Sequence, residues 1–375
     1  MAIPFLVSAS LYNYKYITKP ILFRFDAEIV HQIATRTGEL FGKSSFVKDA
    51  ISKIFAFESD YLKQNICGID FKNPLGLAAG FDYEARLTQI LASFGFGFQS
   101  VGTITNMAYE GNPKPRLGRL PESNSLMVYK GFKNDGADYV ARKLQGLQFP
   151  IPLGISIGKT NSKQISTQNE AVKDITQAFE KFENAKIANK YYELNISCPN
   201  LFGNVDFYSP KKLRNLLSAI ESLKIKKPIF VKMPIDKSNY ETLLLLEAIS
   251  SSSIQGVIFG NLLRDRNHKG LIKNEVEKFP KGNFSGKPCF HRSNQLIQLA
   301  RKNYKKRFVI VGCGGIFSPE DAFIKIALGA NLTQLITGMI YKGPGLISQI
   351  NMELEKIIKN HGLKNISEAV GIFTD

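Results

Sequence analysis

The feature that most constrains the fold of this 375-residue chain is a series of short apolar runs separated by helix-like segments. Eight such runs lie after residue 70, at 75–80, 96–105, 153–158, 191–197, 229–234, 256–261, 308–315 and 332–338. Continuous apolar runs are typical of parallel strands that are buried on both faces. Helices are expected between most of the runs, over 84–94, 169–188, 210–223, 240–250, 293–302, 319–328 and 345–360. This alternation predicts an α/β fold of the (β/α)8 TIM barrel type.

An open, doubly wound α/β sheet is the alternative architecture. The eightfold repeat favours the barrel, and so does the absence of a Gly-x-Gly-x-x-Gly motif near the start of the chain. In a barrel of this kind the functional residues lie at the carboxyl ends of the strands.

The first 60 residues differ from the rest, and we expect a small N-terminal helical extension over 1–60 and a barrel over 61–375. Asp26 is placed to cap a helix that begins at Ala27, and a second helix is expected after Ser44 or Ser45. A hairpin is expected over 67–73. The two helices either pack on the barrel or turn their apolar faces toward a membrane. In the second case the headgroups would meet Lys15, Lys19, Arg24, Arg36, Lys43, Lys48 and Lys53.

Composition narrows the possible partners. The chain has 49 Lys and Arg residues against 32 Asp and Glu, and its formal net charge of +17 favours anionic ligands, nucleic acid or an anionic membrane surface. The basic residues are dispersed, with no zinc finger and no arginine-rich arm, so we expect no nucleic-acid binding. The four cysteines form no Cys-x-x-Cys pair, and we expect no metal site. No apolar stretch approaches the roughly 18–20 residues of a membrane span, so membrane contact is expected to be peripheral.

Small, amide, hydroxyl and amine side chains end the predicted strands, as a site for a large, polar, planar cofactor requires. The glycines of 311–316 and 336–338 let backbone N–H groups approach an anion closely, and barrels of this class often hold phosphate there. Glycines also serve ordinary tight turns. Lys232 lies in an apolar strand; it either reaches solvent at the strand end or stabilises negative charge on a reduced flavin.

The run Glu-Leu-Asn-Ile-Ser-Cys-Pro-Asn at 193–200 places Cys198 just beyond the end of a predicted strand. The simplest interpretation is a small, buried, inert cysteine in a turn. The neighbouring Asn195 and Asn200 can hold a polar ligand, so Cys198 is also a candidate base.

The chain resembles dihydroorotate dehydrogenases of class 2, the quinone-dependent, membrane-associated class. The matching stretches are 71–82, 95–97, 102–105, 111–116, 194–200, 231–232, 285–288, 312–316 and 342–344, and residues 25–31 resemble the first helix of that class. The resemblance implies FMN-dependent oxidation of dihydroorotate to orotate in pyrimidine biosynthesis, with a membrane quinone as acceptor. It also implies a peripheral location on the cytoplasmic face of a membrane, which is the inner membrane if the source is bacterial.

By position, the resemblance implies Cys198 as the base and His31 at the quinone tunnel. The implied FMN contacts are Ala79, Gly80, Thr103, Ser156, Asn195, Lys232, Gly260, Gly286, Gly315, Ile336 and Thr337. The implied substrate contacts are Tyr83, Asn195, Asn200 and Asn261.

Four residues depart from the class 2 pattern. Cys198 stands where class 2 enzymes have serine, and a thiol acts as a base more readily than a hydroxyl if the site lowers its pKa. Tyr83 replaces a lysine, Val128 an orotate-binding asparagine, and Leu262 a threonine. The flavin site is therefore expected to be intact and the substrate site altered, with Lys130 or Lys133 as a substitute cation. Two alternatives stay open: an FMN oxidoreductase for another dihydro-heterocycle or enoate-type substrate, and a catalytically silent relative.

Overall fold

The computed structural model describes residues 2–203 and 205–374 and contains a closed barrel of eight parallel strands. Each strand pairs in parallel with its neighbours, and β13 pairs with β3 to close the ring. The strands are β3 (Leu75–Leu77), β4 (Phe98–Ile104), β7 (Leu153–Ile157), β8 (Tyr191–Asn195), β9 (Ile229–Met233), β10 (Gly256–Phe259), β12 (Val309–Cys313) and β13 (Leu332–Leu335). All eight predicted runs contain one of these strands, so the barrel prediction is confirmed and the open sheet is wrong.

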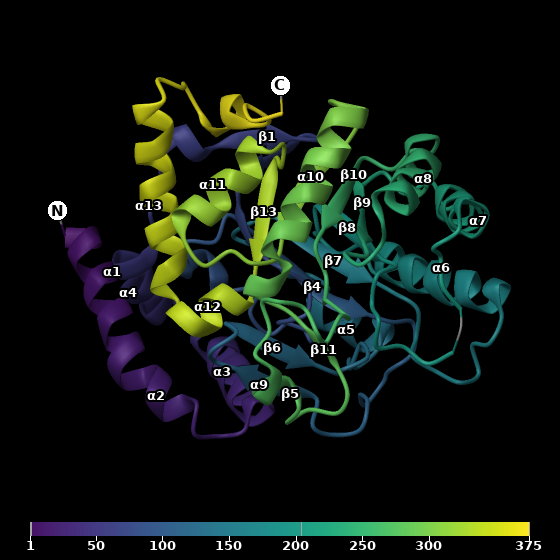
Figure 1. Ribbon diagram of the computed structural model, residues 1–375, viewed down its shortest axis with the longest axis horizontal. Helices are drawn as coiled ribbons and strands as arrows, with labels where there is room; N and C mark the ends of the chain where they lie inside the picture. Colours follow the sequence, from purple (N-terminus) through teal and green to yellow (C-terminus); the bar gives the residue numbers. More distant parts are fainter. Residues whose placement is uncertain (1, 204, 375) are drawn as a thin grey trace.

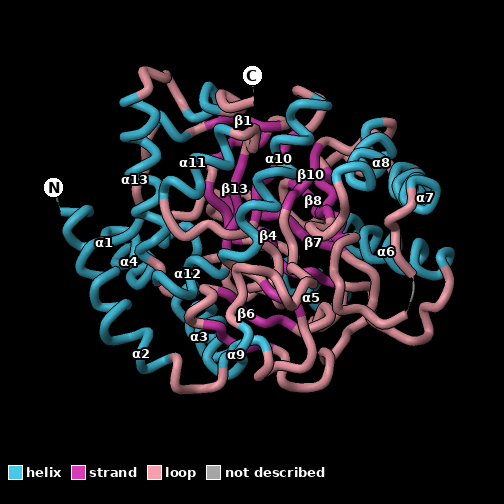
Figure 2. Tube along the Cα trace, viewed as in Figure 1, coloured by secondary structure: helices cyan, strands magenta, loops and turns pink. Residues whose placement is uncertain are grey.

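Helices surround the strands (Figures 1 and 2). Six of the expected helices form: α6 (Gln168–Asn184), α7 (Pro210–Glu221), α8 (Asn239–Ser250), α10 (Phe290–Tyr304), α11 (Pro319–Ala327) and α13 (Gly345–Asn360). Three more were not predicted: α5 (Ala137–Leu144), α9 (Lys273–Val276) and α12 (Thr337–Lys342).

The helix predicted over 84–94 is wrong. Only a 3-10 turn, η3 (Leu91–Phe94), forms there. The carboxylate of Asp82 accepts hydrogen bonds from the backbone N–H groups of Arg86 and Leu87, each at 2.8 Å. A side chain that holds backbone donors in this way competes with a regular helix.

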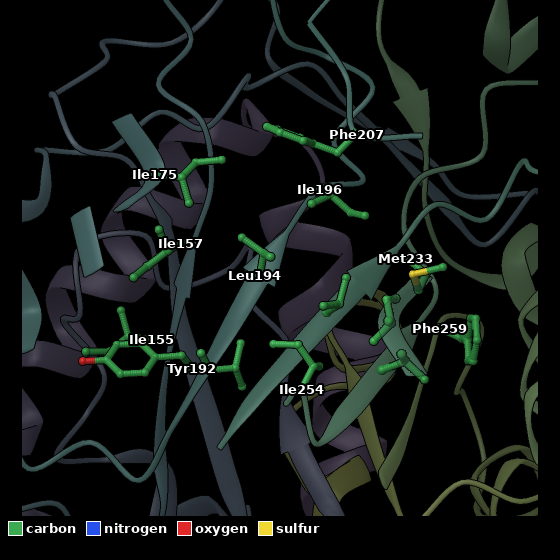
Figure 3. Packing of buried hydrophobic residues seen from close by; sticks show 14 of the residues in the cluster. Ile155, Ile157, Ile175, Tyr192, Leu194, Ile196, Phe207, Met233, Ile254 and Phe259 are labelled. Carbon is green, nitrogen blue, oxygen red and sulfur yellow. The ribbon is translucent and has the colours of Figure 1, made fainter. Parts of the chain in front are cut away.

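Two apolar layers hold the barrel together. Inside it, Phe98, Tyr191 and Phe230 pack against Phe71 from the predicted hairpin, which forms as β1 (Gln64–Ile66) and β2 (Ile69–Phe71). Outside it, alternate side chains of the same strands pack against the helices, among them Tyr192 and Leu194 (Figure 3). The strands are therefore buried on both faces, which explains why they read as continuous apolar runs.

A second, antiparallel sheet was not predicted. It consists of β5 (Leu117–Leu120), β6 (Ser125–Val128) and β11 (Asn283–Phe284), with β6 in the middle. Its strands are at most four residues long, and β11 lies far from the other two in the sequence.

The extension contains more helix than predicted. α3 (Ala27–Gly42) and α4 (Ser45–Phe55) confirm the two expected helices, and Asp26 and Ser44 cap them. Before them come α1 (Ala2–Asn13), a π-helical turn η1 (Tyr14–Thr18) and α2 (Lys19–Leu22). α1 packs beside α13, near the opposite end of the chain (Figure 1). The hydroxyl of Tyr14 donates a hydrogen bond to the Ile340 carbonyl at 2.7 Å.

Replacing Asp26 with alanine removes the acceptor that holds the N–H groups of Glu28 and Ile29, each at 2.9 Å. We expect the free energy of opening of the first turn of α3 to fall by about 1 kcal/mol. Amide hydrogen exchange at these two residues measures it. Asp26→Asn is the matched control, because its side-chain oxygen still accepts; an equal loss in both variants would contradict the capping role.

Candidate active site

A single cavity of about 780 Å³ connects the barrel mouth with helix α3 of the extension. At the barrel end it is lined by the strand termini and the loops that follow them. At the other end it is lined by the inward face of α3, including His31 and Val30. Ile29, Ile33 and Phe41 line the cavity and are also exposed, so the cavity opens at the surface of the extension.

The structure brings nearly all the predicted site residues to this cavity. They are His31, Ala79, Gly80, Tyr83, Thr103, Asn195, Cys198, Asn200, Lys232, Gly260, Asn261, Gly286, Gly315, Ile336 and Thr337. Ser156 differs: it lies beneath the lining, fully buried, and its hydroxyl shares a hydrogen bond with that of Thr103 at 2.9 Å. The Ser156 side chain therefore does not reach the cavity itself but helps to fix the Thr103 hydroxyl, which lies in the cavity wall.

A chain of amide and hydroxyl groups fixes the floor of the barrel mouth. Asn195 donates to the Thr103 hydroxyl at 2.8 Å, and its carbonyl oxygen accepts from the backbone N–H and the hydroxyl of Ser197. Asn261 donates to the same Ser197 hydroxyl at 2.5 Å. The Ser197 contacts also end β8 at Asn195, two residues before the predicted end of the run. These side chains are held in place before any ligand binds.

Asn200 connects the loop of Cys198 with the second sheet. Its amide donates to the Val128 carbonyl at 3.0 Å, and its side-chain oxygen accepts from Asn283 at 2.5 Å. Asn112 in turn donates to the Asn200 carbonyl at 3.0 Å. The loop of the candidate base is thus fixed from two sides.

The thiol of Cys198 lies on the cavity wall, but burial raises its pKa to about 11. The backbone N–H of Asn200 and the charges of Arg264, Lys232 and Lys159 lower that pKa without offsetting the burial. The condition set from the sequence, a lowered thiol pKa, is therefore not met: the protein around the thiol disfavours its charged form.

The barrel mouth also contains groups that can hold an anionic, planar cofactor. Lys232 is buried and forms no hydrogen bond or ion pair with the residues that the structure describes. A Cβ on Gly80 would meet only the Ile336 side chain, at 3.6 Å, so the backbone is open to the cavity there. The hydroxyls of Ser285 and Thr337 lie 2.8 Å apart at the same wall.

His31 stands at the other end of the cavity. Its Nε2 lies 2.7 Å from the Phe81 carbonyl, which can only accept, so Nε2 carries the proton. Nδ1 is buried and has no partner among the described residues. Burial, more than any other cause, lowers the pKa of this imidazole to about 4. His31 therefore presents an uncharged ring with one unused acceptor.

Lys130 is the cavity residue that the sequence located least well. The sequence offered Lys130 and Lys133 equally, but only Lys130 lines the cavity; Lys133 lies 3.9 Å from Glu84 outside it. Every second residue from Leu126 through Val128 to Lys130 lines the cavity, as expected along an extended strand. This period of two in the sequence could have shown that Lys130, and not Lys133, points into the cavity. Arg119 and Ser285 also line the cavity and were not predicted.

Fold and cavity together define a (β/α)8 barrel enzyme with its site at the carboxyl ends of the strands. The sequence model described as dihydroorotate dehydrogenase matches residues 61–358. The chain is 34% identical over 376 residues to the dihydroorotate dehydrogenase (quinone) of Trichormus variabilis, covering 96% of this chain and 98% of that protein. It is 35% identical over 347 residues to the dihydroorotate dehydrogenase (quinone) of Christiangramia forsetii, covering 91% and 98%.

Among solved structures, the DHODH of Eimeria tenella in complex with ferulenol is similar, with a TM-score of 0.80 and 26% identity over 93% of this chain and 96% of that one. The chain therefore belongs to the dihydroorotate dehydrogenase family and is an oxidoreductase of that family. The resemblance to the quinone-dependent class is confirmed by the relatives.

Because the His31 pKa is about 4 in the folded protein and 6.5 ordinarily, the unfolded chain takes up a proton between these values. Stability conferred by the neutral ring is present above pH 6.5 and is lost as the pH falls toward 4. We expect His31→Gln to reduce this loss by up to a few kcal/mol. Chemical denaturation at pH 4.5 and 7.5 measures the difference; the same pH dependence in wild type and variant would contradict the assignment. His361→Gln, at an exposed histidine, is the control.

Proposed function

We propose that this protein oxidises dihydroorotate to orotate with FMN as cofactor and a membrane quinone as electron acceptor, in pyrimidine biosynthesis. The observation that carries the proposal is the single cavity. It joins a thiol and a preorganised amide cluster at one end to an uncharged histidine at an apolar, surface-opening end, in a chain of this family. A polar substrate such as dihydroorotate and an apolar acceptor such as a quinone need a site with one polar and one apolar end.

The residues of the barrel mouth fit FMN. The cavity volume lies within the range of about 300–1,000 Å³ typical of cofactor sites. Lys232, Asn195 and Thr103 would hold the flavin ring, while Gly286, Gly315 and Thr337 would hold the phosphate. Bound FMN would accept a hydride from the substrate and transfer the electrons to the quinone.

Cys198 would take the proton from the substrate carbon next to the one that loses hydride. Asn195, Asn200 and Asn261 would orient the substrate ring, because their amides are already fixed by neighbouring groups. His31 would face the quinone through its free Nδ1.

The extension would bind the membrane peripherally, on the cytoplasmic face. Large apolar side chains are exposed on all its helices, among them Phe5, Tyr12, Ile21, Ile33, Leu40 and Phe46. Basic residues lie between them, as anionic lipid surfaces require. No helix in the described part of the chain is long and apolar enough to cross a membrane. The family match begins at residue 61, which supports the proposed division into an extension (1–60) and a barrel (61–375).

One observation favours an alternative to dihydroorotate as the substrate. Tyr83, Val128 and Leu262, which replace polar residues of the class, all line the cavity. Each unmade hydrogen bond weakens binding by roughly 1–3 kcal/mol, so another dihydro-heterocycle or an enoate-type molecule is the alternative substrate.

Anaerobic reduction of the purified flavoprotein tests the proposal directly. Dihydroorotate should bleach the flavin, and added quinone should restore its colour. No bleaching at millimolar dihydroorotate would remove the substrate assignment, and bleaching by another substrate of the panel would replace it. A protein without FMN, or with FMN that no reductant can cycle, would be the catalytically silent relative.

Replacing Cys198 with alanine should leave FMN bound and slow flavin reduction by dihydroorotate roughly 10²–10⁴-fold, because the base is gone. In the wild type, the thiolate fraction grows as pH rises toward about 11, the pKa of the thiol. The rate of flavin reduction should therefore rise about tenfold per pH unit from pH 7 to 10. Stopped-flow absorbance measures both effects.

Cys67→Ala is the matched control, because Cys67 is exposed in the hairpin at the other end of the barrel. An unchanged rate in Cys198→Ala would leave Cys198 a structural residue.

Phe46 is 80% exposed on α4, and burying its ring in lipid would stabilise binding. We expect Phe46→Asp to weaken binding to vesicles containing anionic phospholipid by at least about tenfold. Vesicle co-sedimentation measures it. Tyr240→Asp is the control, since Tyr240 is 71% exposed at the start of α8, far from the extension (Figure 1). Equal losses in both variants would show that α4 is not the membrane contact.

A further inference from the structure

Three lysine and arginine side chains line the cavity: Arg119, Lys130 and Lys232. Dihydroorotate and orotate each carry one carboxylate, and a buried carboxylate needs a cation or several hydrogen-bond donors. The lysine that the class places after Gly-Phe-Asp is Tyr83 here. A cation for the substrate carboxylate has therefore to be sought at another position than 83.

Arg119 is already engaged at the extension. Its Nη1 donates to the Phe25 carbonyl at 2.7 Å, and its guanidinium lies 4.7 Å from the centre of the Phe23 ring. Lys232 lies inside the barrel, in register with Asn195 on the neighbouring strand, where the flavin is proposed to bind. Of the three, only Lys130 has neither role.

The extended backbone from Leu126 to Lys130 directs the Lys130 side chain into the cavity. Leu126, Val128 and Lys130 alternate on the cavity face, whereas Met127 points into the core of the protein. Two groups fix this segment: Asn200 holds the Val128 carbonyl at 3.0 Å, and the Asn112 N–H donates to the Lys130 carbonyl at 3.2 Å. Because Asn200 lies two residues after Cys198, the cation and the candidate base are on adjoining loops.

The ammonium group of Lys130 is buried and only weakly neutralised. The residue is 5% exposed, and its Nζ lies 3.5 Å from Glu28 Oε1 of α3 and 4.4 Å from the centre of the Tyr83 ring. The same Glu28 oxygen lies 3.5 Å from Arg116, so two cations share one carboxylate oxygen at long range. A net positive charge with unused donors is left at the cavity wall. Burial lowers the Lys130 pKa to about 8, and an anion in the cavity would raise it again.

We infer that Lys130 binds the carboxylate of the substrate and replaces the lysine that the family has at position 83. The Tyr83 ring supports the ammonium from below through a cation–π contact, and Glu28 holds it until the substrate carboxylate arrives. Lys130 is thus a specificity-determining residue for anionic substrates. The inference depends on the proposed function.

The test compares an anion with its neutral analogue. Orotate and methyl orotate differ in one charge, and both affinities are measured on the FMN-loaded protein through the change in flavin absorbance. The variant is Lys130→Gln combined with Glu28→Gln, so that neither member of the Lys130–Glu28 pair is left without the other. Arg116, which also lies near Glu28, keeps its hydrogen bond to the Asn112 carbonyl. Roughly ten- to a hundredfold weaker binding of orotate is expected, with methyl orotate within about twofold of wild type. Lys130→Arg should restore part of the orotate affinity.

Lys133→Gln is the matched control, because Lys133 is three residues away and outside the cavity. It should bind both ligands as the wild type does. Equal losses of orotate and methyl orotate in the double variant would indicate a structural role and overturn the inference. So would a double variant that binds orotate normally and loses only quinone reduction. A wild-type protein that neither binds orotate nor is reduced by dihydroorotate would instead remove the proposed function itself.

Discussion

The closure of the barrel by backbone hydrogen bonds between β13 and β3 is the constraint on which the rest of the structure depends. Thr333 and Leu75 become register partners although they lie near opposite ends of the barrel sequence. Because all eight strands are parallel, this one pairing places every carboxyl end on the same rim. For that reason one cavity is lined by Asn195, Cys198 and Lys232, although Lys232 is more than 30 residues away from the other two in the sequence.

The extension lines the end of the cavity that lies away from the barrel mouth. α3 supplies His31 and Val30 to the cavity lining. His31 contacts the Phe81 carbonyl of the barrel, and the carboxylate of Glu28 lies near Lys130. A charge on α3 therefore acts on a lysine of the barrel, and a barrel carbonyl determines the tautomer of a histidine on α3. The two parts of the chain differ in sequence character but form one site.

The sequence predicted the strands well because burial on both faces leaves a simple apolar signal. It failed where side chains decide the backbone path, as at Asp82, whose carboxylate replaces a helix with turns. It also missed the second sheet, since Asn283 of β11 pairs with Val128 of β6 across 155 residues of sequence. The first helix escaped because α1 is apolar all around and carries no helical period.

For the site, the resemblance to a known family named nearly all the residues that the structure brings to one cavity, and the predicted strand ends indicated where most of them would lie. The electrostatic state of those residues was not predictable in the same way. The thiol of Cys198 and the imidazole of His31 both have strongly shifted pKa values, and the main cause in each case is burial by residues distant in sequence. The choice between Lys130 and Lys133 likewise depended on β6, a strand that was not predicted although the sequence alternates with a period of two there.

The packing of α1 against α13 has a consequence for the nascent chain. Val7 is fully buried in the finished protein, and Leu11 lies against Gly345. During synthesis α1 leaves the ribosome more than 300 residues before its partner α13. At about 5–20 residues per second, the apolar helix waits on the order of tens of seconds for its site to exist. Until α13 has been made, Val7 and Leu11 lack the packing partner that buries them in the folded protein.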